Sequence, residues 1–260
     1  MLVFAIAFNT FREAVRDKIL YVLAGFGVAL ILVARAVGWV SYGGEAKITT
    51  DLGLTSIWLF TALISIFIGT GMIYKEIDKR TLYTILSKPI DRWEFVLGKY
   101  AGLLLTSGVS LLLLSSIFLA YLKLTGAPLT WALVQALALT FFELAILNAL
   151  AIFFSSASTP VLSAIFTSAL FALGQLTKWI VEMGMLGQGS PAIGKLMLGV
   201  YLFMPNLHNF NARREAVEAA GNGLNLAIPL DQTWSAVMYG ISYTAVVLLG
   251  AVFMFRRRNF

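Results

Sequence analysis

The chain has 260 residues, of which 59% are hydrophobic and only 12% are charged, and its formal net charge is +6. A water-exposed surface needs a larger share of charged residues, so this composition excludes an ordinary soluble domain and indicates a membrane protein. Cysteine is absent, which excludes disulfides, thiolate metal sites and a cysteine nucleophile. The basic residues cluster in short segments between apolar runs, a pattern typical of membrane topology, so we expect no nucleic-acid partner.

Residues 1–17 have the pattern of an amphipathic helix. Phe4, Phe8 and Phe11 recur at spacings of four and three residues and share one face, and we expect Arg12 and Arg16 on the opposite face. A helix with such faces lies in the membrane interface. We therefore expect an interfacial elbow helix before the first span, with a polar extension of that span as the alternative.

Six apolar stretches are long enough to cross a bilayer as helices, since a span needs about 20 mostly apolar residues. They cover roughly 19–40, 55–74, 98–122, 131–154, 160–182 and 234–255. Barrel strands would alternate between apolar and polar residues, which these stretches do not. Placing the N-terminus inside leaves 12 of the 19 Lys and Arg residues on inner segments, and this bias predicts cytoplasmic termini. We expect an all-α integral membrane fold, a single membrane domain over 1–260, in the cytoplasmic (inner) membrane.

The inner segment 75–97, between the second and third spans, is the most informative. We expect a short helix over 76–86, because Pro89 disfavours helical backbone at the residue before it. Asp91 and Glu94 have the spacing of a capping box, so the third span should begin sharply at Asp91. Two helices joined by a stiff corner can transmit force, which predicts a cytoplasmic coupling segment.

Glu143 lies midway along the fourth predicted span, and Asn148 follows about one turn later. A charge at that depth costs about 3 kcal/mol on insertion scales, so it should face a protein interior or a cavity. Glu143 and Asn148 could line a translocation path, with Glu143 as a proton site. The alternative is a hydrogen-bonded anchor between spans, and both interpretations stay open.

We expect short outer loops over 41–54 and 123–130, and the segment 184–233 is the one long outer loop. Its apolar run 192–203 is too short to span, so we expect it to be interfacial or re-entrant. Further on, the pattern predicts a short soluble helix over 212–220, with Asn211 as its N-cap. The polarity of this helix suggests an extracytoplasmic protein as partner. His208 has several methionines near it in sequence, but their spacing is irregular and we expect no metal site.

Taken together, these segments resemble the permease family of type-2 ATP-binding-cassette exporters. Its smaller members include permeases linked to nitrous-oxide-reductase maturation and gliding motility. The start AFNTFREAVRDKIL is similar to the family's elbow helix, and the end FRRRNF to its basic tail. The strongest resemblance is to the coupling segment, with the pattern E-x-x-x-R-T-L-x-x-x-L-S-x-P-x-x-R. Its residues are Glu76, Arg80, Thr81, Leu82, Leu86, Ser87, Pro89 and Arg92, with Lys79 beside Arg80.

The resemblance implies a six-span subunit that pairs with a second permease copy or a paralogue and with two copies of a cytoplasmic ATPase. ATP and Mg would bind to that ATPase, because this chain lacks a G-x-x-x-x-G-K-[ST] phosphate loop, and we expect it to be neither an enzyme nor a cofactor-binding subunit. ATP hydrolysis would drive export or mechanical action on an extracytoplasmic partner. The alternative is a gradient-driven secondary transporter that uses Glu143, although unbroken spans count against it.

Overall fold

The computed structural model describes residues 2–40, 45–78, 91–179, 182, 199, 204–222 and 227–257, and no strand occurs among them. The helices are α1 (Leu2–Val15), α2 (Lys18–Val40), α3 (Glu45–Asp78), α5 (Arg92–Thr125), α6 (Trp131–Ala157), α7 (Pro160–Gln175), the 3₁₀ helix η1 (Leu207–Phe210), α10 (Arg213–Asn222) and α11 (Leu230–Arg257). Five of them, α2, α3, α5, α6 and α11, are long and apolar enough to cross a membrane. This confirms the predicted all-helical class and five of the predicted spans.

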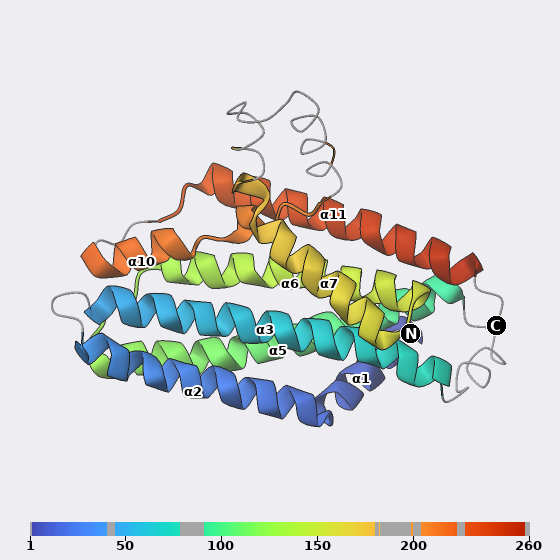
Figure 1. Cartoon of the computed structure of the whole chain (residues 1–260), viewed down its shortest axis with the longest axis horizontal. Coiled ribbons are helices and arrows are strands. Elements are labelled where there is room, and N and C mark those ends of the chain that lie inside the picture. The colour runs from blue at the N-terminus through green and yellow to red at the C-terminus, as the bar shows by residue number, and fades with distance from the viewer. Residues whose placement is uncertain are drawn as a thin grey trace.

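The long helices lie side by side in one bundle (Figure 1). The start of α1, the end of α3, the start of α5 and the end of α11 lie toward the same end of the bundle, here termed the terminal end. The opposite end, termed the distal end, holds α10 and the start of α3. The two helix ends that flank the segment predicted to couple to an ATPase therefore lie at the terminal end.

Helix α6 is at the centre and packs against α3, α5, α7, α10, η1 and α11. Every residue from 143 to 152 is buried, because this helix is apolar on all sides and has neighbours on all sides. By contrast, α2 and α11 expose large apolar side chains such as Phe26 and Leu249. Exposed apolar faces of this extent fit the hydrocarbon of a bilayer.

Helix α1 confirms that the N-terminal segment is helical, and it packs against α5 at two glycines. A Cβ at Gly102 would lie 2.5 Å from the Cβ of Thr10, so only glycine allows this approach. Phe4 is 78% exposed on the outer face of α1. The prediction that Arg12 lies opposite the aromatic face is wrong. Its guanidinium lies 5.4 Å from the Phe8 ring centroid, because residues four apart share a helix face.

Helix α3 is one continuous helix, which corrects two predictions. The outer loop expected over 41–54 is helical from Glu45, because this part of α3 packs against α10 and buries Thr49, Thr50 and Leu54. Residues 76–78, the start of the separate helix expected over 76–86, instead continue α3, since the sequence has no glycine or proline between Met72 and Asp78 to break it. Residues 79–86 lie outside the described residues. Tertiary packing thus overrides the polar composition of the first turns.

The third predicted span begins as expected, with Asp91 at the N-cap of α5. The predicted capping box is wrong, since the Asp91 side chain makes no capping hydrogen bond and instead accepts one from Trp93 Nε1 at 3.3 Å. At its other end, α5 stops at Gly126, whose φ of 73° is left-handed and suits glycine. The turn to α6 therefore falls inside the predicted loop 123–130.

Helix α7 ends at Gln175, earlier than the predicted span 160–182. A Cβ at Gly174 would lie 2.8 Å from both Leu207 Cγ and the Pro205 carbonyl oxygen, so the chain before η1 packs directly on the end of α7. Sixteen residues of helix span about 24 Å, less than the roughly 30 Å of a hydrocarbon core. Apolar residues of the predicted run 192–203 lie outside the described residues, except Gly199.

The predicted polar outer helix is confirmed as α10, but it is not a free soluble helix. Ala216, Ala219 and Ala220 are buried because α10 packs against α3 and α6. Asn211 is not its N-cap, since the first helical hydrogen bond runs from Ala216 N–H to the Ala212 carbonyl. Helix α10 is therefore part of the bundle.

Candidate functional site

The Glu143 carboxylate lies in the middle of α6 and is 1% exposed. Trp58 Nε1, from α3, donates to both of its oxygens at 3.0 Å. Gln175 Nε2, from the last turn of α7, donates to Oε1 at 2.6 Å. Three helices, α3, α6 and α7, are thus joined at the Glu143 carboxylate, and the last residue of α7 is the glutamine that donates to it.

Arg213, the first residue of α10, covers this carboxylate site from the distal side. Its guanidinium carbon lies 4.1 Å from the centroid of the Trp58 ring, a cation–π contact. Its NH1 donates to Thr55 Oγ1 at 3.2 Å, and its Nε donates to Asn211 Oδ1 at 3.1 Å. Burial lowers the pKa of Arg213, while the negative charge of Glu143 opposes this shift. An arginine stays charged even so, and it compensates the buried carboxylate.

A second buried polar cluster surrounds Asn148. Asn148 Nδ2 donates to Ser107 Oγ at 2.9 Å, and that hydroxyl lies 2.8 Å from Ser65 Oγ. This cluster joins α6 to α5 and α3. Residues five apart on a helix differ by about 140° around its axis, so Glu143 and Asn148 point in different directions. The two candidate path residues therefore lie in separate clusters.

The coupling residues lie at the terminal end, as far as they are described. Lys79, Arg80, Thr81, Leu82, Ser87 and Pro89 lie outside the described residues. Glu76 is in the last turn of α3. Arg92, the first residue of α5, donates through NH1 to the Phe255 carbonyl at 3.0 Å, near the end of α11. The Phe95 and Phe255 rings stack at 5.4 Å between centroids, so the start of α5 is bound to the end of α11.

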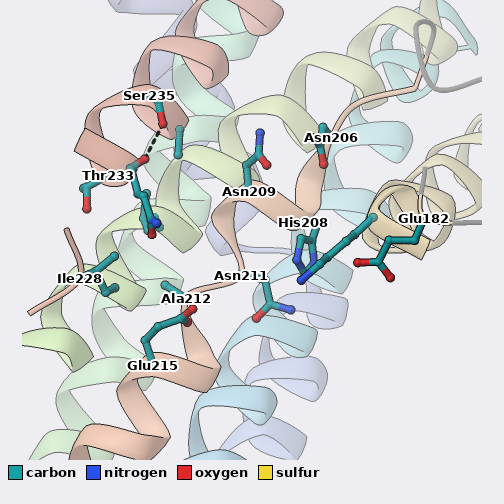
Figure 2. Close-up of a pocket in the computed structure, with 14 residues that line it drawn as sticks. Glu182, Asn206, His208, Asn209, Asn211, Ala212, Glu215, Ile228, Thr233 and Ser235 are labelled. Carbon is teal, nitrogen blue, oxygen red and sulfur yellow. Dashed lines mark hydrogen bonds between the residues drawn. The ribbon is translucent and has the colours of Figure 1, made fainter. Parts of the chain in front are cut away.

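A cavity of about 580 Å³ opens at the distal end, between the end of α7, η1, α10 and the start of α11 (Figure 2). Its walls carry ionisable groups, amides and hydroxyls, among them Lys178, Glu182, His208 and Glu215. Burial, and next the positive charge of Lys178, lower the pKa of His208, which favours the neutral imidazole at neutral pH. Among the described residues, no group of three or more His, Asp or Glu side chains could hold a metal ion.

Sequence reasoning missed Trp58, Gln175 and Arg213 as partners of Glu143. Gln175 had a usable signal, because an uncharged polar residue directly after a glycine in an apolar run indicates a helix end with a polar neighbour. Arg213 had none, since it follows Glu143 by 70 residues in a polar loop. Long-range pairs of this kind are visible only once the fold is known.

Long apolar helices joined by buried polar clusters define a multi-pass membrane protein. The chain matches the family of ABC-2 family transporter proteins over residues 4–260, and it belongs to that family. It is therefore the permease, or transmembrane subunit, of an ATP-binding-cassette transporter. Permeases of this family work with a separate ATPase and are commonly dimeric. A search of curated proteins finds no match to this chain.

Proposed function

We propose that this permease couples ATP hydrolysis by two copies of a separate cytoplasmic ATPase to movement of its spans, through the coupling segment 75–97. The family match over residues 4–260 carries this proposal, because it includes the whole coupling pattern. The geometry supports it, since α3 leads into this segment and α5 leads out of it at the terminal end. ATP and Mg are bound by the ATPase, and this subunit has no catalytic residue.

The topology that fits this role has six spans, with α7 and the residues after it as the fifth. Both termini are cytoplasmic, the membrane is the cytoplasmic (inner) membrane, and α1 is the interfacial elbow helix. The exposed Phe4 and Phe8 on α1 support that position, because they offer aromatic rings to the interface. A second copy or a paralogue completes the pore-forming pair. This is the small six-span kind similar to permeases of nitrous-oxide-reductase maturation and gliding motility.

The work done at the distal end is export or mechanical action on an extracytoplasmic partner protein. The packing of α10 against α3 and α6 favours a mechanical contribution, because a shift of α3 displaces α10 with it. Residues 184–233 are then the region that contacts the partner. Deleting residues 214–221 in this case abolishes partner capture and leaves ATPase stimulation intact.

A gradient-driven secondary transporter that uses Glu143 is the second candidate. The observation that favours it is a carboxylate buried at membrane depth between three helices. Against it, Arg213 and Trp58 already compensate this carboxylate, as expected of a structural anchor. Under the ATP-driven proposal, transport stops on ATP depletion and survives an uncoupler. The opposite pattern, abolished by Glu143→Gln, supports the gradient-driven alternative.

The first experiment is purification from native membranes in a mild detergent, with mass spectrometry of co-purifying proteins. We expect an ATPase that carries a phosphate loop, and we expect Arg80→Glu to release it. Lys123→Glu, which reverses a charge at the distal end, is the matched control and should retain the ATPase. A permease that emerges without any ATPase, under conditions that keep other transporters of this class intact, contradicts the proposal.

A further inference from the structure

Among the described residues, the distal cavity carries ionisable side chains that form no ion pair with one another. Lys178 and Glu182 follow α7, His208 is on η1 and Glu215 is on α10, and all four line the cavity (Figure 2). Within the described part of the chain, none of the four side chains forms a hydrogen bond or an ion pair, and Lys178, Glu182 and Glu215 are exposed to solvent. They are close enough to interact, because the three charged groups all influence the pKa of His208.

The charge balance of the lining favours a cation. Glu182 and Glu215 contribute two carboxylates against the one ammonium of Lys178, and His208 is neutral at neutral pH because its pKa is lowered. The described residues of the lining thus have an excess of one negative charge. Carboxylates that face a cavity without an internal partner gain most from a ligand that brings a cationic donor.

The remaining lining offers hydrogen bonds to a polar ligand. The amides of Asn209 and Gln232 and the hydroxyls of Thr233 and Ser235 face the cavity. Both hydroxyls donate to carbonyls of their own segment, which leaves their oxygens free to accept. A volume of about 580 Å³ lies within the range of roughly 300–1,000 Å³ that small-molecule sites have.

The walls are held in place before any ligand arrives. Gln135 of α6 donates through Nε2 to the Ile228 carbonyl at 3.1 Å and accepts from the Ile228 N–H at 2.8 Å. On the opposite wall, Tyr239 Oη accepts from the Asn206 N–H at 2.7 Å. A site with fixed walls loses less conformational entropy on binding.

From these observations we propose that the distal cavity binds a small polar ligand that carries a protonated amine. Glu182 and Glu215 face the amine, and the amides and hydroxyls bind the polar body. An amino sugar and a lysine side chain on a short peptide share this chemistry. The proposal goes beyond coupling to an ATPase, because binding requires only the distal end of this chain.

Titration calorimetry on the purified full chain in lipid nanodiscs tests the proposal with two matched probe series. The sugar series is glucosamine, glucose and glucuronate; the peptide series is N-acetyl-lysine amide and N-acetyl-norleucine amide. In at least one series, we expect the cationic probe to bind about tenfold tighter than the neutral one, the gain from one charge-assisted hydrogen bond. The series that shows this preference identifies the source of the amine. Equal binding of charged and neutral probes in both series, or no binding, overturns the proposal.

Two glutamates on α10 provide a matched pair of variants. Glu215 lines the cavity, whereas Glu218, one turn later, binds Arg214 outside it. Glu215→Gln should remove the preference for the amine, and Glu218→Gln should keep it. Glu182→Gln provides a second cavity variant in case Glu215→Gln does not yield folded protein. An amine preference that survives both cavity variants overturns the assignment. ATPase co-purification is unaffected either way, so failure here is distinguishable from failure of the proposed function.

Discussion

Replacing Arg213 with methionine should destabilise the protein strongly, because it uncovers a buried carboxylate. The substitution removes the cation–π contact with Trp58 and the bond to Thr55, and it leaves Glu143 buried without a positive charge nearby. Removing one partner of a directly bonded, buried ion pair costs about 3–5 kcal/mol, and Arg213 acts on Glu143 through its charge alone, without a direct ion pair between these two described residues. We expect about 3 kcal/mol here, at the lower end, because Trp58 and Gln175 still donate to the carboxylate.

The assay is the apparent melting temperature in detergent, followed by loss of the monodisperse peak after heating. A loss of about 3 kcal/mol corresponds to a fall of roughly 6–12 °C in a chain of this size. Arg214→Met is the matched control, since Arg214 is 85% exposed and its surface pair with Glu218 is worth less than about 1 kcal/mol. Adding Glu143→Gln to Arg213→Met should recover part of the loss, because it removes the uncompensated charge. Equal effects of the two arginine variants, or additive losses in the double variant, would refute the reasoning.

Three further predictions follow from other parts of the bundle. Gly102→Val should lower the melting temperature by several degrees, because a Cβ there meets α1 at once, whereas Gly71→Ala, which has open space, should not. Arg92→Ala should reduce permease-stimulated ATPase activity at unchanged expression, because it frees the start of α5 from the Phe255 carbonyl; unchanged stimulation contradicts that role. The contribution of His208 to stability should be lost as the pH falls below about 6.5, since the folded state, with the pKa of His208 lowered, takes up this proton less readily than the unfolded chain. His208→Gln should flatten this pH dependence in melting curves, and an unchanged slope would contradict it.

Much of the helical framework could be predicted from the sequence, because the signal is local. Apolar runs set five spanning helices, and Asp91 marks the start of α5. The position of Glu143 midway along the apolar stretch 131–154 predicted that its side chain would be buried in the protein and would need polar partners. Of the partners, Gln175 had a local signal that was missed, whereas Arg213 could not be predicted, since nothing local ties it to Glu143.

The failures also have physical causes. The start of α3 was predicted to be a polar loop, and α10 was predicted to be a helix free in solvent. Both predictions are wrong for one reason, because the start of α3 and α10 pack against each other. The end of α7 was placed too late because apolar residues such as Leu176 and Trp179 still occur after Gly174. Only the fold shows that Leu207 occupies the space beside that glycine.

The continuity of α3 has a consequence for how motion passes through the molecule. Its 34 residues form a rod of about 51 Å, longer than a bilayer's hydrocarbon core is thick. An unbroken helix moves as one body, so a tilt of about 5° imposed at Asp78 displaces the Glu45 end by about 4 Å over that length. Trp58 is fixed to this rod, and Arg213 lies on Trp58. A displacement of the terminal end of α3 would therefore also move its distal end and α10, which packs against it. No residue of α3 would have to unfold for this motion.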